Sequence, residues 1–318
     1  MQTQTLPRLT YWFAFSVLLL VGTHALADKQ AKQLTLADGD RPILSYNVTT
    51  VPSPIEDAPW FSRSGFIHPV YSPEGRVVTD PFPADHPHQH GLMFAWTSSE
   101  YEGQKVDFWN AKKKQGKIEH VKTIQADANT IKVELRHKII GGKHKGTTVL
   151  NETWTVTRVE HDTLNIFDLV SVQTCATDKP LTVNKHKYGA MCIRGPARWS
   201  TGDAMLTSEG KSQKEGNHTR PDWVALFGEA VRHGETDTQL AGIAAMAHPD
   251  NKHGPQPVRL HPEMSYFCFA PMIHDGFQIK PGEPFISKFR FVTYDGKPDP
   301  KTLDAIWKQY ASPAKKTN

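Results

Sequence analysis

The stretch DHPHQHG, residues 85–91, places one aspartate and three histidines within seven positions and closes on a glycine. Asp85, His86, His88 and His90 are residue types that bind metal ions or transfer protons. The same imidazoles could instead be held by backbone carbonyls in a surface loop. We therefore weigh three interpretations of this histidine cluster: a metal site, an acid–base site and a structural loop.

A metal site places strict demands on geometry. Alternate residues of an extended strand lie roughly 6.6 Å apart, so His86 and His90 would be separated by about 13 Å. Zinc requires nitrogen ligands within about 2.1 Å of the ion. Two neighbouring histidines could share an ion, and a bend in the loop could add the third, with Asp85 or His68 as a further ligand. A divalent metal ion held by His86, His88 and His90 is thus an alternative, although no cofactor is favoured.

An acid–base site demands less of the same residues. An unperturbed histidine titrates near pH 6.5, so a row of imidazoles lining a groove can bind hydroxyl groups and transfer protons near neutrality. Gly91 directly after the row allows a tight turn or the close approach of a ligand. We favour this interpretation.

Two later segments carry comparable side chains. The segment NKHKYG, residues 184–189, inserts His186 and its flanking lysines between two apolar runs, where positive charge is costly unless it faces solvent or a polar site. The segment AHPDNKHG, residues 247–254, presents His248 and Asn251 after a long apolar run. A connecting loop and a binding role are both consistent with the second segment.

Aromatic side chains accompany these groups. Trp96 lies just past the histidine cluster, and Trp109 lies beside Asp107 and Asn110. An indole ring can stack on the apolar face of a sugar while neighbouring polar groups bind its hydroxyls. Arg194, close to a further tryptophan, could form another wall of such a site.

The elements that must position these residues are strands. Hydrophobic residues alternate with polar ones in TIKVELRHKII (130–140), LNETWTVT (150–157) and FISKFRFVTY (285–294), and turn-forming residues separate the runs. This period of two is typical of antiparallel strands with one buried face. The pattern predicts an all-β fold, a large antiparallel β-sandwich formed by one domain over residues 28–318.

A short helix is predicted at the C-terminus. Asp299 can cap it, and Pro300 suits its first position. One helical stripe is apolar and comprises Leu303, Ile306, Trp307 and Tyr310.

The first 27 residues resemble a targeting segment. Arg8 precedes an apolar run of about 14 residues, and Ala25 and Ala27 are the small residues that a signal peptidase reads. The run is short for a helix that crosses about 30 Å of hydrocarbon. Residues 1–27 are therefore predicted to be a signal peptide of a periplasmic or secreted protein, with a retained anchor as the alternative.

Charge and hydropathy exclude two classes of protein. The chain has 37 basic and 33 acidic side chains, and removal of Arg8 leaves 36 against 33, a net charge of +3. This balance, without a dense basic and aromatic run, argues against a nucleic-acid partner. No second long apolar stretch exists, so no stable membrane span is expected after signal cleavage.

Longer motifs resemble a known family. The sequence GFIHPVYSPEGRVVTDPFPADHPHQHGLMFAW, followed by DFWN, NKHKYGAMCIRG and AHPDN, resembles the PmoA-like family of exported bacterial proteins over about residues 40–295. That family carries the label methane oxygenase and is otherwise of unknown function. The label fits poorly, since the methane oxygenase subunit itself spans the membrane many times.

A second resemblance is to the galactose mutarotase-like superfamily. HQHG resembles one histidine motif of aldose epimerases, and NKHKYG resembles another, with His186 and Tyr188 at the matching positions. IKPGEPFISKFRF, residues 279–291, resembles their final turn and strand. The resemblance implies a sandwich of the supersandwich type that acts on sugars.

In these epimerases a histidine protonates the ring oxygen of the sugar, and a glutamate on a late strand removes a hydroxyl proton. The corresponding segment here, SYFCFAPMI (265–273), has no glutamate. Glu263 precedes it and Asp275 follows it. The departure argues against simple mutarotation while leaving other epimerase- or lyase-like reactions open.

We therefore expect an exported carbohydrate-active protein, an enzyme with His90 and His186 as proton donors or acceptors. Asp85 would orient or charge a neighbouring imidazole, and His88 and Lys187 would stabilise negative charge on an oxygen. A metal-dependent enzyme and a non-catalytic carbohydrate-binding module are the alternatives. The side chains expected to hold the saccharide are His68, His86, Trp96, Trp109, Tyr188, Arg194, His248 and Asn251.

Overall fold

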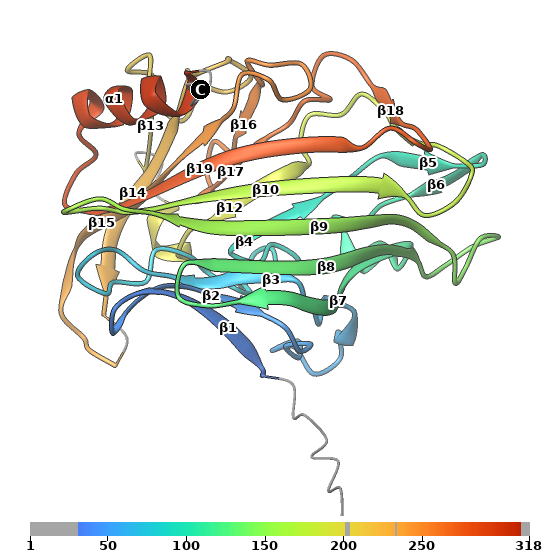
Figure 1. Cartoon of the computed structure of the whole chain (residues 1–318), viewed down its shortest axis with the longest axis horizontal. Coiled ribbons are helices and arrows are strands. Elements are labelled where there is room, and N and C mark those ends of the chain that lie inside the picture. Colours follow the sequence, from blue (N-terminus) through green and yellow to red (C-terminus); the bar gives the residue numbers. More distant parts are fainter. Residues whose placement is uncertain (1–30, 201–203, 233, 313–318) are drawn as a thin grey trace, which may run out of the picture. The chain divides into compact units, whose positions relative to one another are not determined.

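The computed structural model describes residues 31–200, 204–232 and 234–312, which fall in one compact unit (Figure 1). The described chain is an antiparallel β-sandwich with a short C-terminal helix, which confirms the predicted fold class. The predicted signal peptide, residues 1–27, lies outside the described residues. Within the described ranges, no helix is long and apolar enough to cross a bilayer.

One layer is a long antiparallel sheet that crosses the front of Figure 1. Eight strands of the described chain form it, and each pairs only with antiparallel neighbours. In spatial order they are β13 (Met205–Thr207), β14 (Val224–Val231), β15 (Thr238–Ala247), β19 (Phe285–Asp295), β10 (Asn165–Cys175), β9 (Thr148–Val159), β8 (Thr130–Ile139) and β7 (Gly116–Ala126).

The facing layer has shorter strands, drawn behind the first sheet in Figure 1. Seven strands of the described residues form it, again all antiparallel. In order they are β1 (Gln33–Asp38), β2 (Arg41–Asn47), β3 (Phe66–Val70), β4 (Leu92–Ala95), β12 (Ala190–Arg194), β17 (Tyr266–Phe269) and β16 (Val258–Leu260).

A small sheet of four described strands lies at one end. Its order is β18 (Phe277–Ile279), β11 (Leu181–Val183), β5 (Ser99–Tyr101) and β6 (Gln104–Val106). The remaining regular elements of the described chain are the 3₁₀ turns Pro59–Phe61, Ala111–Lys113 and Ala197–Trp199, and the helix α1 (Pro300–Ala311).

Alternation builds the core between the two large sheets. In β8 every second residue from Ile131 to Ile139 is buried, as the period of two predicts. Tyr46 of β2 packs edge-on against Trp154 of β9, with 6.2 Å between ring centroids. Burial of each large apolar side chain contributes about 1.5–3 kcal/mol, so such contacts hold the layers together.

The helix α1 covers the outer face of the long sheet. Asp299 caps it by accepting a hydrogen bond from the Lys301 backbone N–H, and Pro300 occupies its first turn. Leu303 and Ile306 are buried in a cluster that includes Trp223. The predicted helix is thus confirmed together with the buried part of its apolar stripe.

A polar network lies inside the core around Glu152, which is 1% exposed. His137 Nε2 lies 2.7 Å from Glu152 Oε2, while Trp154 and Ser171 donate hydrogen bonds to Oε1. Burial favours the neutral acid, but these hydrogen bonds bring the pKa of Glu152 below its ordinary value. The core therefore contains an ionised carboxylate that is fully satisfied by its neighbours.

Candidate functional site

One cavity of about 180 Å³, which we call the basic pocket, is lined by five of the predicted site residues, namely His86, His88, Trp109, Lys187 and Tyr188. Four segments that are far apart in the sequence line it. Its walls are His86, His88, Gln89, Trp109, Asn110, Lys187, Tyr188, Arg259, His261, Met264 and Tyr266. The histidine cluster and the segment 184–189 thus meet at one site.

Short strands explain why these segments meet. The histidine cluster enters β4, and the segment 184–189 enters β12, which pairs with β4 in antiparallel register. A four-residue strand spans only about 13 Å, so long side chains reach across it. The hairpin formed by β16 and β17, next to β12 in the sheet, adds the Arg259 and His261 side chains.

An ion pair beneath the loop fixes the histidine cluster. Arg194 is fully buried, and it donates to Asp85 Oδ1 at 2.7 Å and to Gln89 Oε1 at 3.1 Å. Burial disfavours the carboxylate form of Asp85, but the guanidinium outweighs burial and brings the pKa of Asp85 below its ordinary range. Arg194 therefore positions the loop from below and is not among the side chains that line the basic pocket.

The turn after the cluster requires glycine. Gly91 has φ +51°, and a Cβ there would lie 2.3 Å from the carbonyl oxygen of Ile67. Any side chain would push the loop away from β3. Gly91 thus allows the tight turn that was expected directly after the histidines.

The three histidines of the cluster do not share one direction. The rings of His86 and His88 lie 5.4 Å apart on the wall of the basic pocket. His90 is 1% exposed, hydrogen bonds through Nδ1 to the Pro81 carbonyl, and packs against Phe82. In the described chain no group of three or more His, Cys, Asp or Glu side chains is arranged to hold a metal ion.

A second cavity, of about 290 Å³, adjoins the first, and we call it the aromatic cavity. His88 and Trp109 line both cavities, so they stand at the boundary between them. The other walls combine rings with polar groups. They include Trp60, Phe61, Phe108, Arg63, Ser62, Ser64, His90, Lys117 and Glu119.

Arg63 is a buried cation on the wall of the aromatic cavity. Its side chain donates one long hydrogen bond, 3.4 Å, to the Phe94 carbonyl, and its Nε has no partner in the described chain. Burial lowers the pKa of Arg63 to about 10, and the carboxylate of Glu152 opposes that effect. Arg63 therefore stays charged at neutral pH, compensated through space by Glu152.

Asp107 fixes the tryptophan at the boundary. Its Oδ1 accepts hydrogen bonds from the backbone N–H groups of Trp109 and Asn110, at 2.9 and 2.8 Å, and its Oδ2 accepts from Lys113 Nζ at 2.8 Å. Burial opposes ionisation of Asp107, but these donors bring its pKa below the ordinary value. Asn110 also donates to the Tyr188 hydroxyl at 3.1 Å, which joins this turn to the segment 184–189.

Two of the pocket histidines are neutral at physiological pH. Burial, followed by the charge of His86, lowers the pKa of His88 to about 4. Burial and the charge of Arg259 lower the pKa of His261 to about 4. Because His261 Nδ1 accepts the N–H groups of Glu263 and Met264, its Nε2 carries the proton and can donate.

The second histidine motif lies at the same site. His186 packs edge-on against Tyr188, with 4.5 Å between centroids, and its buried Nε2 has no partner in the described residues. Burial lowers the pKa of His186, while Asp107 acts in the opposite direction. Lys187 and Tyr188 line the basic pocket directly.

Five predicted binding residues lie outside these cavities, Arg194 beneath the loop and four others. Trp96 is in the core, where its indole donates to Gln173. His68 hydrogen bonds to Thr79 through Nδ1, and burial lowers its pKa to about 4. The other two, His248 and Asn251, lie near β19.

His248 packs against Tyr310 of α1, with 5.2 Å between centroids. Asn251 exchanges two hydrogen bonds of 2.8 Å with the backbone of Lys288. The segment 247–254 therefore continues from the end of β15 along β19 and does not join the basic pocket.

Several residues that line the cavities belong to none of the motifs identified in the sequence. They are Arg63, Arg259, His261 and Tyr266, which lie within strands or directly beside them. The two-residue spacing of Arg259 and His261 in an otherwise apolar stretch was the available signal. The epimerase pattern has a glutamate in the strand 265–273, which this chain lacks, and the nearest carboxylates, Glu263 and Asp275, are both exposed and line neither cavity.

Comparisons with known proteins give a family and distant structural likenesses. The chain matches the family of unknown function (DUF6807) over residues 33–308. No curated protein matches the sequence. Among solved structures, the GH36 α-galactosidase AgaA from Geobacillus stearothermophilus is similar at 12% identity and a TM-score of 0.38, over 83% of this chain and 40% of that chain. AgaB from the same organism is similar at 11% identity and a TM-score of 0.39, over 85% and 40%. The chain thus spans about 40% of the length of these galactosidases.

Proposed function

We propose that the chain, which belongs to the family of unknown function DUF6807, is an exported carbohydrate-active enzyme. The observation that carries the proposal is the pair of adjoining cavities that share His88 and Trp109. Their combined volume falls within the range of small-molecule sites, about 300–1,000 Å³. Export rests on the predicted signal peptide and on the resemblance to the PmoA-like family.

The walls suit a saccharide. The half-buried indole of Trp60 offers an apolar surface to a sugar ring in the aromatic cavity. Phe61, Phe108 and Trp109 lie buried behind that wall, and Trp109 is only 1% exposed. Serine hydroxyls and the Arg63 guanidinium provide hydrogen bonds for sugar hydroxyls. Apolar rings alternating with hydrogen-bonding groups match the two kinds of surface that a pyranose presents.

His88 is the residue best placed to transfer a proton. It lies between the cavities, and with a pKa of about 4 it is neutral at pH 7 and can accept a proton. His90 lies with it on the wall of the aromatic cavity, His186 packs against Tyr188 of the basic pocket, and Lys187 can stabilise a developing negative charge. This arrangement supports epimerase- or lyase-like acid–base chemistry on a saccharide.

The test starts from the mature protein and a panel of mono- and oligosaccharides. Binding would be measured by calorimetry, and conversion by NMR of the sugar over time. His88→Ala, His90→Ala and His186→Ala should each reduce turnover by about 10²–10⁴-fold. His248→Ala is the matched control, because His248 lies near β19 and should leave turnover unchanged.

Three outcomes would contradict parts of this proposal. A saccharide that binds and stays unchanged over days would indicate a non-catalytic binding module. Turnover that needs a stoichiometric metal lost in His88→Ala would indicate a metalloenzyme. If no saccharide binds at all, the proposed function fails.

A further inference from the structure

Two cations on the wall of the basic pocket have no counterion. Arg259 and Lys187 line the pocket, and among the described residues no carboxylate lines it, while Asp85 lies 3.5 Å from His86 Nδ1 behind the wall. Arg259 is half-buried, and its guanidinium makes no hydrogen bond or ion pair within the described chain. Lys187 likewise has no acidic partner there.

This arrangement differs from that of the other arginines near the site. Arg194 is paired with Asp85 at 2.7 Å. Arg63 has the ionised Glu152 behind it. Arg259 has no such counterion, although partial burial makes an unpaired guanidinium costly.

The neighbours of Arg259 increase the positive potential. Its charge is among the causes that lower the pKa of His261 and of His218, and Lys187 also acts on His218. An anion entering the pocket would meet the Arg259 guanidinium, the Lys187 ammonium and the Nε2–H of His261. A guanidinium binds a carboxylate or a sulfate through two parallel hydrogen bonds, which are stronger than those to neutral acceptors.

From these observations we propose that the substrate is an acidic saccharide, whose anionic group binds Arg259 in the basic pocket. The inference rests on the proposed function, because it uses the same cleft. The sugar ring that bears the anion lies beside Tyr188 and His88 in the basic pocket, and the following part of the saccharide enters the aromatic cavity. The anion is the carboxylate of a uronic acid or a sulfate ester, which present the same charge to the guanidinium.

The experiment compares acidic saccharides with neutral ones on the full mature chain. The probes are di- and trigalacturonate, a sulfated galacto-oligosaccharide, and the neutral galacto-oligosaccharides of equal length, each titrated by calorimetry at pH 7. We expect acidic probes to bind at least tenfold more tightly than neutral ones. The carboxylate and sulfate arms decide which anion the pocket takes.

Variants locate the charge that is responsible. Arg259→Gln and Lys187→Gln should each weaken the binding of acidic probes far more than that of neutral ones and so remove most of the preference for acidic probes. The matched control is Lys185→Gln, since Lys185 is an exposed lysine two positions from Lys187 that does not line the pocket. It should keep the full preference.

The failures of the two proposals are distinguishable. Neutral saccharides that bind as tightly as acidic ones would overturn the inference and leave the proposed function standing. An acidic preference that survives Arg259→Gln and Lys187→Gln would also overturn it. Absence of binding by every saccharide, acidic or neutral, would remove the proposed function as well.

Discussion

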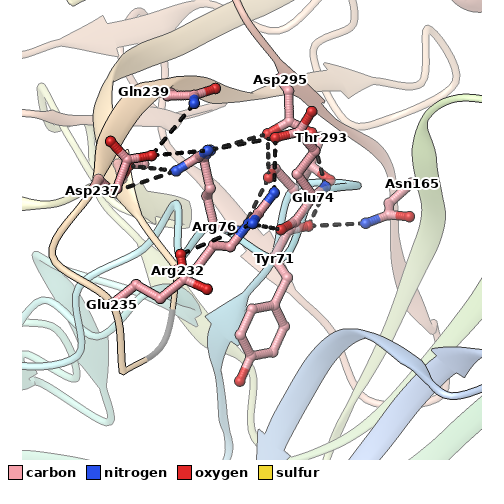
Figure 2. A network of polar contacts seen from close by, with 12 residues as sticks. Tyr71, Glu74, Arg76, Asn165, Arg232, Glu235, Asp237, Gln239, Thr293 and Asp295 are labelled. Atoms are coloured by element: carbon pink, nitrogen blue, oxygen red, sulfur yellow. Dashed lines mark hydrogen bonds and ion pairs between the residues drawn. The ribbon is translucent and has the colours of Figure 1, made fainter.

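Two clusters of charged side chains in this protein have opposite designs. Figure 2 shows the first, in which Arg76 is surrounded by carboxylates. Arg76 is 1% exposed, and Glu74, Asp237 and Asp295 lie 3.5–3.8 Å from its guanidinium. Arg232 pairs with the same Glu74 at 3.2 Å. In this cluster the protein itself supplies counterions for its buried charge.

The same cluster ties distant segments together. The Tyr71 carbonyl accepts hydrogen bonds from Thr293 of β19 and Asn165 of β10, as Figure 2 also shows. Arg76 donates to the backbone carbonyls of Ala230 and Asp237, around the turn between β14 and β15. Charge that is neutralised in this way stabilises the fold and leaves little for a ligand to bind.

The basic pocket is the contrasting case. Its cations, Arg259 and Lys187, line a cavity, and within the described chain neither forms an ion pair with a carboxylate. The difference teaches that burial of an arginine is not by itself a sign of function. The informative feature is whether the protein or a ligand provides the counterion.

The largest expected effect is on the free energy of unfolding, to which the two clusters should contribute unequally. Arg76→Met should lower the free energy of unfolding by about 2–4 kcal/mol, because it removes charge-assisted hydrogen bonds and leaves three carboxylates close together. Arg259→Met, the matched change in the basic pocket, should stay within about 0.5 kcal/mol of the parent. Urea denaturation of both variants provides the measurement. Equal destabilisation by the two substitutions would abolish the distinction drawn above.

The second expected effect is a loss of folding stability at acidic pH. The pKa of His88 is about 4 in the folded protein because of burial and the positive charges of His86 and Arg194, with Asp85 and Asp107 opposing. The unfolded chain therefore binds more protons between pH 6.5 and 4, and stability should fall as the pH falls through this window. His88 alone should contribute about 1 kcal/mol per pH unit.

Urea denaturation between pH 7 and 4.5 tests this slope. His88→Asn should flatten it by the contribution of one histidine, whereas Lys185→Gln should leave it unchanged. A slope that is the same in His88→Asn and in the parent would mean that His88 is not held neutral by the fold.

A smaller effect is expected from salt. Raising NaCl from 0.1 to 1 M shortens the Debye length from about 10 to about 3 Å. Affinity for an acidic saccharide at the partly open basic pocket should therefore fall by about tenfold, while affinity for a neutral saccharide should change little. Calorimetry at both salt concentrations measures the two responses. Salt-independent binding of the acidic probe would indicate contacts that do not depend on charge.

The sequence predicted the sandwich and the C-terminal helix because both depend on local periodicity. The alternation in β8 and the Asp299–Pro300 helix start are each readable within a dozen residues. The sequence was interpreted as bringing the histidine cluster, the segment 184–189 and the segment 247–254 into one site, and only the first two line the basic pocket. The motifs did not predict the orientation of each side chain. His90 Nδ1 is hydrogen bonded to the Pro81 carbonyl, whereas His88 lines both cavities.

Other parts of the site depend on strand pairing that one sequence does not reveal. Arg259 and His261 reach the pocket because β16 and β17 form a hairpin next to β12. His248 and Asn251 are residue types that occur in binding sites, but hydrogen bonds between Asn251 and Lys288 hold their loop against β19, beyond the end of β15. Two polar loops of similar composition can therefore lie at different places in the fold, because the strand to which each loop is attached decides its position.

The smallest expected effect tests the epimerase pattern itself. Because Glu263 and Asp275 are exposed and line neither cavity, Glu263→Gln and Asp275→Asn should change turnover on an accepted saccharide by less than about twofold. Asp85→Asn provides the contrast, since it weakens the ion pair with Arg194 and loosens the loop that carries His88. We expect it to lower turnover by about tenfold or more. A large loss of turnover in Glu263→Gln or Asp275→Asn would show that one of these carboxylates moves into the cleft when substrate binds. The basic pocket would then contain a catalytic acid, and its contrast with the Arg76 cluster would no longer rest on the absence of a carboxylate.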